Sequence, residues 1–211
     1  MKYKNIIFDF GNVIGKFKGD YILGKFASTP EDYDILADAI FKNWVALDAG
    51  TIDYDQNAED TIAELPDRLK DTARDFFENW FQYVDPLPET WEFIKELKAR
   101  GVPIYLLSNA QRIFTEPEMK MLGIYELFDG ILYSSDAGVK KPSHYFFEDL
   151  FEKYGLKKED SVMIGNEYEA DILGADAFGI TSMYVHTSQS GKRPEKLPDG
   201  CMEIAVIGEV F

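Results

Sequence analysis

A short apolar run that ends on an aspartate lies near the start of the chain and constrains the fold more than any other feature. Ile6, Ile7 and Phe8 are too few for a helix but suit a buried strand. Asp9 follows at once, and turn-forming residues lead from it to Gly15. A carboxylate in this position lies in the crevice where open α/β sheets bind ligands. The stretch alone fits a solvated strand-end carboxylate equally well, so the rest of the chain must decide.

The composition indicates a folded globular chain and argues against several classes of partner. Of the 211 residues, 45% are hydrophobic, which suffices for one α/β domain with a modest insertion. The net charge is −16, and Lys and Arg cluster only in the short GKRPEK near residue 191. We therefore expect neither nucleic acid nor an anionic membrane as a partner. A phosphorylated substrate would need a locally positive site.

Cysteine use and the first residues indicate the compartment. Cys201 is the only cysteine, so neither a disulfide framework nor a thiolate metal site is expected. Asp9 interrupts the first apolar run too early for a signal peptide, and no apolar stretch approaches 18 residues. We expect a soluble, cytoplasmic protein.

Two patterns of predicted elements divide the chain. Residues 18–84 show only helical patterns, with Thr29 and Pro30 as the start of one helix. From Asp85 onward, strands and helices alternate. The predicted strands are 103–107, 131–134, 161–164, 182–185 and an edge strand at 204–207, and the predicted helices are 88–100, 116–122, 143–154 and one ending at 178. This alternation predicts an α/β fold with a doubly wound parallel sheet, a Rossmann-like core of residues 1–17 and 85–211, interrupted by an all-helical insert of residues 18–84.

Polar residues follow the predicted strands. They are Asp9, Ser108 with Asn109, the loop to Lys140 and Lys141, and the group Asn166, Glu167 and Asp171. The carboxyl ends of parallel strands meet at one sheet edge, so these groups can converge. Phosphoryl transfer through an aspartyl intermediate uses groups of these types: a carboxylate nucleophile, hydrogen-bond donors, a Lys and an acidic cluster that binds a cation.

Four segments in this order resemble the motifs of the haloacid dehalogenase-like hydrolase superfamily. They are the strand ending on Asp9, LLSN (106–109), VKKP (139–142) and IGNEYEAD (164–171). The helical insert resembles the first-position cap of that superfamily. FDFGNVI and LDAGTIDYD (47–55) most resemble the branch that contains sugar-1-phosphate phosphatases and the amino-terminal phosphatase domain of soluble epoxide hydrolases.

The resemblance implies a Mg²⁺ site. Asp9 would be both nucleophile and metal ligand, and the backbone carbonyl of Gly11 would be a second ligand. Asn166, Glu167 and Asp171 would supply the remaining ligand and orient the motif lysine. Many members of the superfamily have Asp where Asn166 stands, and the neutral amide predicts weakened metal binding unless Glu167 or Asp171 compensates.

The resemblance also implies how the phosphoryl group is held. Ser108 and Asn109 would bind it, and Asn12 would line the same substrate site. Lys141, which precedes Pro in the motif, would neutralise the nucleophile and the phosphate. Lys140 would remain a solvated neighbour.

The insert supplies further candidates for contact with the substrate, Trp44 at the pocket mouth and Asp48. Many family phosphatases carry a general acid where this chain has Gly11, and glycine cannot protonate a leaving group. One hypothesis is a substrate with a good leaving group, such as an anomeric sugar phosphate. The other is an acid from the insert, Asp48 or Asp53, although solvated turn carboxylates are the simpler interpretation of both.

The predicted function is Mg²⁺-dependent hydrolysis of a small phosphorylated metabolite, with a sugar phosphate as one candidate, by a monomer or homodimer. A metal-independent 2-haloacid dehalogenase is one alternative. Against it, the insert has no Arg before Arg68 to bind halide, and Asn166-Glu167 does not match the serine-rich fourth motif of that branch. A catalytically silent phosphate-binding module is the other alternative, and Gly11 and Asn166 both favour it.

Overall fold

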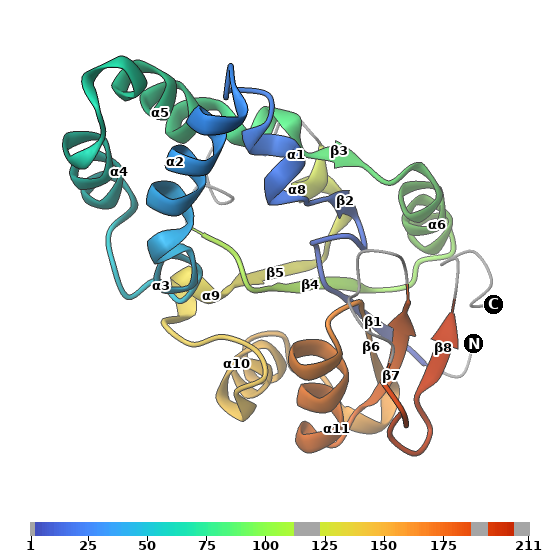
Figure 1. The fold of residues 1–211 in the computed structure, drawn as a ribbon. Helices are drawn as coiled ribbons and strands as arrows, with labels where there is room; N and C mark the ends of the chain where they lie inside the picture. Colours follow the sequence, from blue (N-terminus) through green and yellow to red (C-terminus); the bar gives the residue numbers. More distant parts are fainter. Residues whose placement is uncertain (1–2, 112–122, 187–193, 205–211) are drawn as a thin grey trace.

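The core of the molecule is a six-stranded sheet in which every pair of neighbouring strands is parallel (Figure 1). A computed structural model describes residues 3–111, 123–186 and 194–204, without the side chains of residues 124 and 125. In sheet order the strands are β5 (Gly130–Tyr133), β4 (Ile104–Ser108), β1 (Asn5–Phe8), β6 (Ser161–Gly165), β7 (Thr181–Val185) and β8 (Met202–Ile204). The predicted α/β class with a parallel, doubly wound sheet is confirmed.

Both faces of the sheet are covered, which explains why its strands are apolar at successive positions. Ile6 and Phe8 face one hydrophobic layer, whereas Ile7 faces the other, because side chains alternate along a strand. The first layer contains Phe93 of α6 and continues into the helical insert. The second contains Phe147 of α10 and residues of α11. The helices of the core are α6 (Pro88–Ala99), α8 (Ile124–Leu127), α9 (Ser134–Ala137), α10 (His144–Tyr154), the 3₁₀ turn η4 (Lys158–Asp160), the π-helix η5 (Tyr168–Leu173) and α11 (Gly174–Phe178).

The helical insert follows β1 and rejoins the core before α6. Its elements are α1 (Gly19–Leu23), α2 (Pro30–Ile40), η1 (Phe41–Asn43), α3 (Trp44–Asp48), α4 (Tyr54–Glu64), α5 (Asp67–Asn79) and η2 (Trp80–Tyr83). The chain enters and leaves the insert through two short antiparallel strands, β2 (Gly15–Lys16) and β3 (Asp85–Pro86). The helical character predicted for this segment is confirmed, and its status as a separate domain stays a prediction.

Local sequence explains how α2 begins and ends. Thr29 Oγ1 accepts a hydrogen bond from the backbone N–H of Asp32 at 3.1 Å, and Pro30 occupies the first helical position, as predicted. The apolar spacing from Ile35 to Trp44 predicts one continuous helix, but the structure breaks it with η1, so α3 is a separate short helix. Trp44, the first residue of α3, packs against the buried ring of Trp80 at 5.4 Å between centroids.

Two other predicted elements differ from the structure or lie beyond it. The predicted edge strand at 204–207 begins two residues earlier, at Met202, and residues 205–207 lie outside the described residues. The predicted helix 116–122 also falls outside them. The predicted helix that ends at 178 is present as η5 followed by α11.

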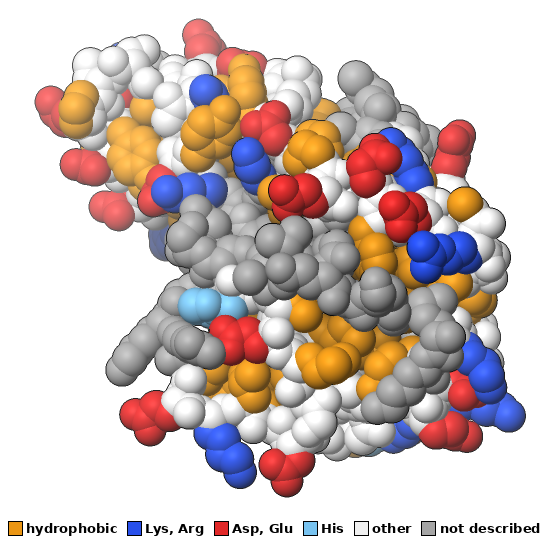
Figure 2. Space-filling view, turned by 90° about the vertical axis from the view of Figure 1, so that its right-hand side faces the viewer, with side chains coloured by type: hydrophobic (Ala, Val, Ile, Leu, Met, Phe, Trp, Pro, Cys, Tyr) orange, Lys and Arg blue, Asp and Glu red, His pale blue; other side chains and the backbone are white. Residues whose placement is uncertain are grey.

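The surface carries the acidic excess of the composition. Figure 2 shows Asp and Glu side chains spread over one face among Lys and Arg side chains. None of the helices in the described part of the chain is long and apolar enough to cross a membrane.

Candidate active site

Asp9, the first predicted site residue, directly follows β1, where the order of the strands in the sheet reverses. The strands β4 and β6 flank β1 on its two sides, so the end of β1 is the topological switch point of the sheet. The backbone N–H of Asp9 continues the pairing of β1 by donating to the Ile164 carbonyl at 2.9 Å. The side chain is 10% exposed. Burial of a carboxylate requires a nearby positive charge.

That charge is the ammonium of Lys141, which is 2% exposed. Its Nζ donates to Asp9 Oδ1 at 2.6 Å and to Asp171 Oδ1 at 2.7 Å. Burial by itself would lower the pKa of Lys141, but the carboxylates of Asp171 and Asp9 raise it overall, so the ammonium persists at neutral pH. Burial raises the pKa of Asp171. The three side chains form a compact, partly neutralised charge cluster at the sheet edge.

The end of β4 holds the Lys141 loop in place. Asn109 donates from Nδ2 to the Lys141 carbonyl at 3.0 Å and accepts from the Lys141 backbone N–H at 2.8 Å through Oδ1. Its side chain therefore fixes the backbone that carries the ammonium. Ser108 is the last residue of β4 and is buried beside the same cavity.

The loop after β6 depends on a close approach that only glycine permits. A Cβ at Gly165 would lie 2.3 Å from the Asp171 side chain. Asp171 Oδ2 in turn accepts from the Glu167 backbone N–H at 2.9 Å. Each Asp171 oxygen thus has a protein partner, one of them the Lys141 ammonium. Burial and the neighbouring Asp9 raise the pKa of Glu167.

The glycine turn after β1 is also held by its own residues. Asn12 adopts φ +55°, the left-handed region that Asn tolerates, and its Oδ1 accepts from the Phe17 backbone N–H at 3.0 Å. A Cβ at Gly11 would lie 3.8 Å from Asp9 Oδ2, so position 11 adjoins the Asp9 carboxylate.

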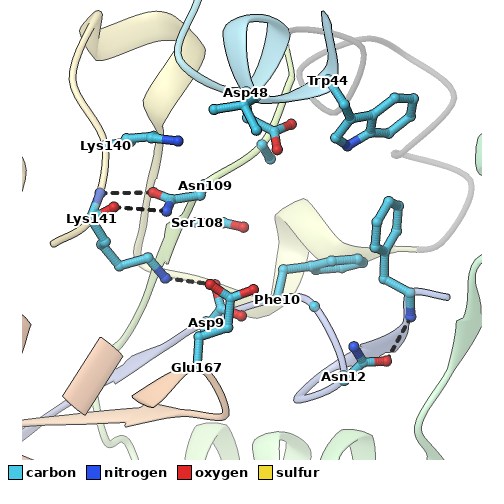
Figure 3. A pocket seen from close by; sticks show the side chains of 14 residues that line it. Asp9, Phe10, Asn12, Trp44, Asp48, Ser108, Asn109, Lys140, Lys141 and Glu167 are labelled. Carbon is cyan, nitrogen blue, oxygen red and sulfur yellow. Dashed lines mark hydrogen bonds and ion pairs between the residues drawn. The ribbon is translucent and has the colours of Figure 1, made fainter. Parts of the chain in front are cut away.

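Core and insert together enclose a cavity of about 280 Å³ (Figure 3). It is lined by Asp9, Phe10, Gly11, Asn12, Phe17, Trp44, Val45, Asp48, Ser108, Asn109, Ala110, Lys140, Lys141 and Glu167. Of the predicted site residues, Asn166 and Asp171 are buried but do not line this cavity. All the others lie on it, whereas the alternative candidate acid Asp53 does not and instead caps α4 by accepting a hydrogen bond from the Gln56 backbone N–H at 2.9 Å.

The insert contributes through α3. Asp48 is the last residue of this helix, and its backbone carbonyl accepts a hydrogen bond from Ser134 Oγ of the core. Burial raises the pKa of the Asp48 carboxyl to about 7, against the opposing effects of the Gln111 amide and the Lys140 ammonium. A carboxyl with this pKa holds a proton on a substantial fraction of molecules at neutral pH.

A family model described as haloacid dehalogenase-like hydrolase matches residues 3–179. The chain belongs to the haloacid dehalogenase-like hydrolases. The matched region contains every residue predicted for the site.

Named relatives of this hydrolase include phosphatases. A glyceraldehyde 3-phosphate phosphatase of Methanothermobacter thermautotrophicus is 29% identical over 130 residues, which cover 62% of this chain and 58% of that protein. A phosphoserine phosphatase of Thermus thermophilus is 28% identical over 147 residues, which cover 69% of this chain and 57% of that protein. The chain therefore spans little more than half the length of these curated relatives.

Solved structures of other hydrolases share the whole fold. YfnB of Bacillus subtilis, a hydrolase of this family crystallised with magnesium, superposes with a TM-score of 0.71 at 18% identity, covering 99% of this chain and 97% of that one. The L-2-haloacid dehalogenase of Xanthobacter autotrophicus gives 0.68 at 17% identity, covering 98% and 96%. At these identities the likeness shows the fold alone. The closer resemblance to the sugar-1-phosphate phosphatase branch stays a prediction.

The residues beside Asp9 fit the Mg²⁺ that the family implies. Asn166 Oδ1 is buried and has no hydrogen-bond partner among the described residues, which suits a hard-cation ligand. Within the described ranges, no three His, Cys, Asp or Glu side chains are grouped to hold a metal. The Asp9 carboxylate, the Gly11 carbonyl and Asn166 Oδ1 would hold the ion, and the predicted ligand Glu167 lies beside Asp9 on the same cavity (Figure 3). Asp171, with both oxygens engaged, suits a positioning role toward Lys141.

Several cavity residues were not singled out from the sequence. Lys140, expected as a solvated neighbour, is half-buried and lines the cavity. Phe10, Phe17 and Val45 add apolar surface to the lining, and the Phe17 ring lies 6.1 Å from that of Trp44 between centroids. Their positions in the sequence offer no signal beyond proximity to Asp9 or to the predicted pocket residue Trp44.

Proposed function

We propose that this hydrolase is a Mg²⁺-dependent phosphatase that acts on a small phosphorylated metabolite through an aspartyl-phosphate intermediate. The observation that carries the proposal is the Lys141 ammonium, held 2.6 Å from Asp9 at the floor of a cavity that the insert covers. A dianionic phosphate can enter an acidic protein only where such a local positive charge exists. The named phosphatase relatives support the same reaction class.

Each of the core residues has a separate role in phosphoryl transfer. Asp9 attacks phosphorus with a carboxylate oxygen, and the bond to the leaving oxygen breaks. The Ser108 hydroxyl and the Lys141 ammonium stabilise the negative charge on the transferring group. Water then attacks the aspartyl phosphate, and the phosphorus–oxygen bond to Asp9 breaks to release phosphate. Mg²⁺, held by Asp9, Gly11 and Asn166, would supply additional charge neutralisation.

The cavity limits the size of the substrate. Its volume of about 280 Å³ lies just below the range of about 300–1,000 Å³ for small-molecule sites. Phe17 and Trp44 provide apolar surface, while Asp48 and Lys140 provide polar groups. This combination suits a short, hydroxylated phosphate monoester, such as a sugar or polyol phosphate.

Phosphate release from a panel of sugar, polyol and amino-acid phosphates, with Mg²⁺ and with EDTA, tests the proposal. The wild type should turn over at least one member only with Mg²⁺, and Asp9→Asn should lose that turnover. Asp38→Asn, which alters an exposed carboxyl of the insert, is the matched control and should keep it.

Two other results would replace the proposal. Halide release from a 2-haloacid without metal would establish dehalogenase chemistry. Binding of inorganic phosphate with no turnover across the panel would establish a silent binding module.

A further inference from the structure

The insert brings one carboxyl group into the cavity, that of Asp48. Figure 3 shows this side chain on the ribbon of the insert, across the cavity from Asp9, with Ser108 and Asn109 between them. Two contacts fix its helix against the core. Ser134 Oγ donates to the Asp48 carbonyl, and Gly50 packs so tightly that a Cβ there would lie 2.5 Å from the Ser135 carbonyl oxygen. The place of Asp48 is thus set by backbone contacts.

In-line geometry determines which side of the cavity receives the leaving group. The attacking and leaving oxygens lie on opposite sides of phosphorus. Asp9 attacks from the core, so the leaving oxygen points toward the insert. Asp48 is the carboxyl on that side.

The other carboxyl that lines the cavity is poorly placed for this task. Glu167 lies beside Asp9 at the core end of the cavity (Figure 3), on the attacking side of phosphorus. Position 11 also adjoins Asp9, but Gly11 has no side chain to donate a proton.

The surroundings of Asp48 keep a proton available. Its pKa is raised to about 7, chiefly by burial and further by the Glu167 carboxyl, while Gln111 and Lys140 oppose the rise. The charged groups that influence it are Lys140 from the loop after α9 and Glu167 from the loop after β6. General acids work best when their pKa is close to the operating pH.

We propose that Asp48 is the general acid of this site and that its natural substrates are phosphate monoesters of alcohols. The inference rests on the proposed phosphatase function. As Asp9 attacks, the phosphorus–oxygen bond breaks, its electron pair passes to the leaving oxygen, and that oxygen takes the proton of Asp48. In the second half-reaction, the Asp48 carboxylate accepts the proton of the attacking water as the bond to Asp9 breaks. Each turnover thus returns Asp48 to its protonated form.

Leaving-group dependence distinguishes a general acid from a structural or binding residue. An alkoxide is a poor leaving group and needs the proton, whereas p-nitrophenolate departs without one. The experiment measures kcat/KM, which reports transfer to Asp9, for the best alkyl phosphate of the panel and for p-nitrophenyl phosphate, with Mg²⁺. Wild type, Asp48→Asn and the control Asp38→Asn are compared from pH 5.5 to 9.

Asp48→Asn should lower kcat/KM for the alkyl phosphate by about 100-fold or more and for p-nitrophenyl phosphate by less than about 10-fold. In the wild type, the ratio of alkyl to aryl kcat/KM should fall above about pH 7, and in Asp48→Asn this fall should disappear. Asp38→Asn should match the wild type with both substrates.

Equal losses on the two substrates would overturn the proposal and leave Asp48 as a binding or structural residue. An unchanged alkyl rate would overturn it as well. If the wild type hydrolyses neither substrate, the phosphatase function itself fails and the general acid fails with it. Wild-type turnover of both substrates therefore separates failure of this inference from failure of the proposed function.

Discussion

Replacing Asp48 by Asn should make the protein more stable at alkaline pH, although it should impair catalysis. In the unfolded chain, the Asp48 carboxyl has its ordinary pKa of 3.8, whereas burial raises the pKa to about 7 in the folded protein. The folded state therefore binds this proton more tightly than the unfolded state. Its contribution to the free energy of unfolding is largest below pH 3.8 and is lost as the pH rises toward about 7. Asn carries no proton to lose, so the variant escapes this loss.

The magnitude follows from the two pKa values. Each pH unit between them changes the free energy of unfolding by about 1.4 kcal/mol, which gives an upper limit of about 4 kcal/mol above pH 7. Partial access of solvent to the cavity reduces this figure. Between pH 5 and pH 8, the stability advantage of Asp48→Asn over the wild type should widen by about 2 kcal/mol, with about 3 kcal/mol as the limit.

Urea unfolding followed by circular dichroism at pH 5 and pH 8 measures the effect, with two-state fits of the wild type and the variant. Asp38→Asn, an exposed carboxyl of α2, serves as the control and should change the free energy of unfolding by less than about 0.5 kcal/mol at both pH values. A stability difference between Asp48→Asn and the wild type that stays constant from pH 5 to pH 8 would refute the reasoning. So would a variant that is less stable than the wild type at pH 8.

Three other substitutions test the architecture of the site. Lys141→Met should lower kcat for phosphate release more than about 100-fold, because the transferring group loses its positive charge. It should also lower the free energy of unfolding in urea by about 3–5 kcal/mol, because the Asp9 and Asp171 carboxylates lose their buried partner. A variant with wild-type stability would contradict this prediction. Gly165→Ala should destabilise the fold by about 1–3 kcal/mol and lower kcat, because the new Cβ must displace Asp171, and an unchanged melting temperature would show that the loop yields freely. Ser134→Ala should cost about 1–3 kcal/mol of stability and reduce kcat/KM for an alkyl phosphate by releasing the carbonyl of Asp48, whereas wild-type kinetics would show that α3 is held without this bond.

The sheet and its polar edge could be predicted because they depend on local patterns. A short apolar run ending on Asp9 predicts a buried strand, and the alternation of elements predicts that strand ends share one edge. Ser108, the last residue of β4, and the residues that follow β6 lie at the same sheet edge as Asp9 for that reason. The sheet places β4 and β6 on either side of β1, whereas Lys141, in the loop after α9, is held near Asp9 by the hydrogen bonds of Asn109 to its backbone.

The face that the insert turns toward the cavity could not be predicted in the same way. Helical periodicity places Trp44 on the apolar face of a long helix, but η1 interrupts that helix and α3 is a separate short helix. The burial of Asp48 depends on how this short helix rests on Ser134, a contact between residues 86 positions apart. Contacts between residues so far apart in the chain cannot be predicted from the spacing of neighbouring residues in the sequence.

In the proposed reaction, the core carries out the nucleophilic attack and the insert protonates the leaving group. The core holds Asp9 and Lys141 in a buried ion pair that needs no contribution from the insert, so binding and attack are prepared at the sheet edge. The proton for the leaving group comes instead from Asp48, on the insert. Gly11 leaves the space beside the nucleophile without an acidic side chain, and the proposed acid, Asp48, lies across the cavity from Asp9. Substrate choice and protonation of the leaving group then depend on the same short helix, so changes in α3 should alter both together.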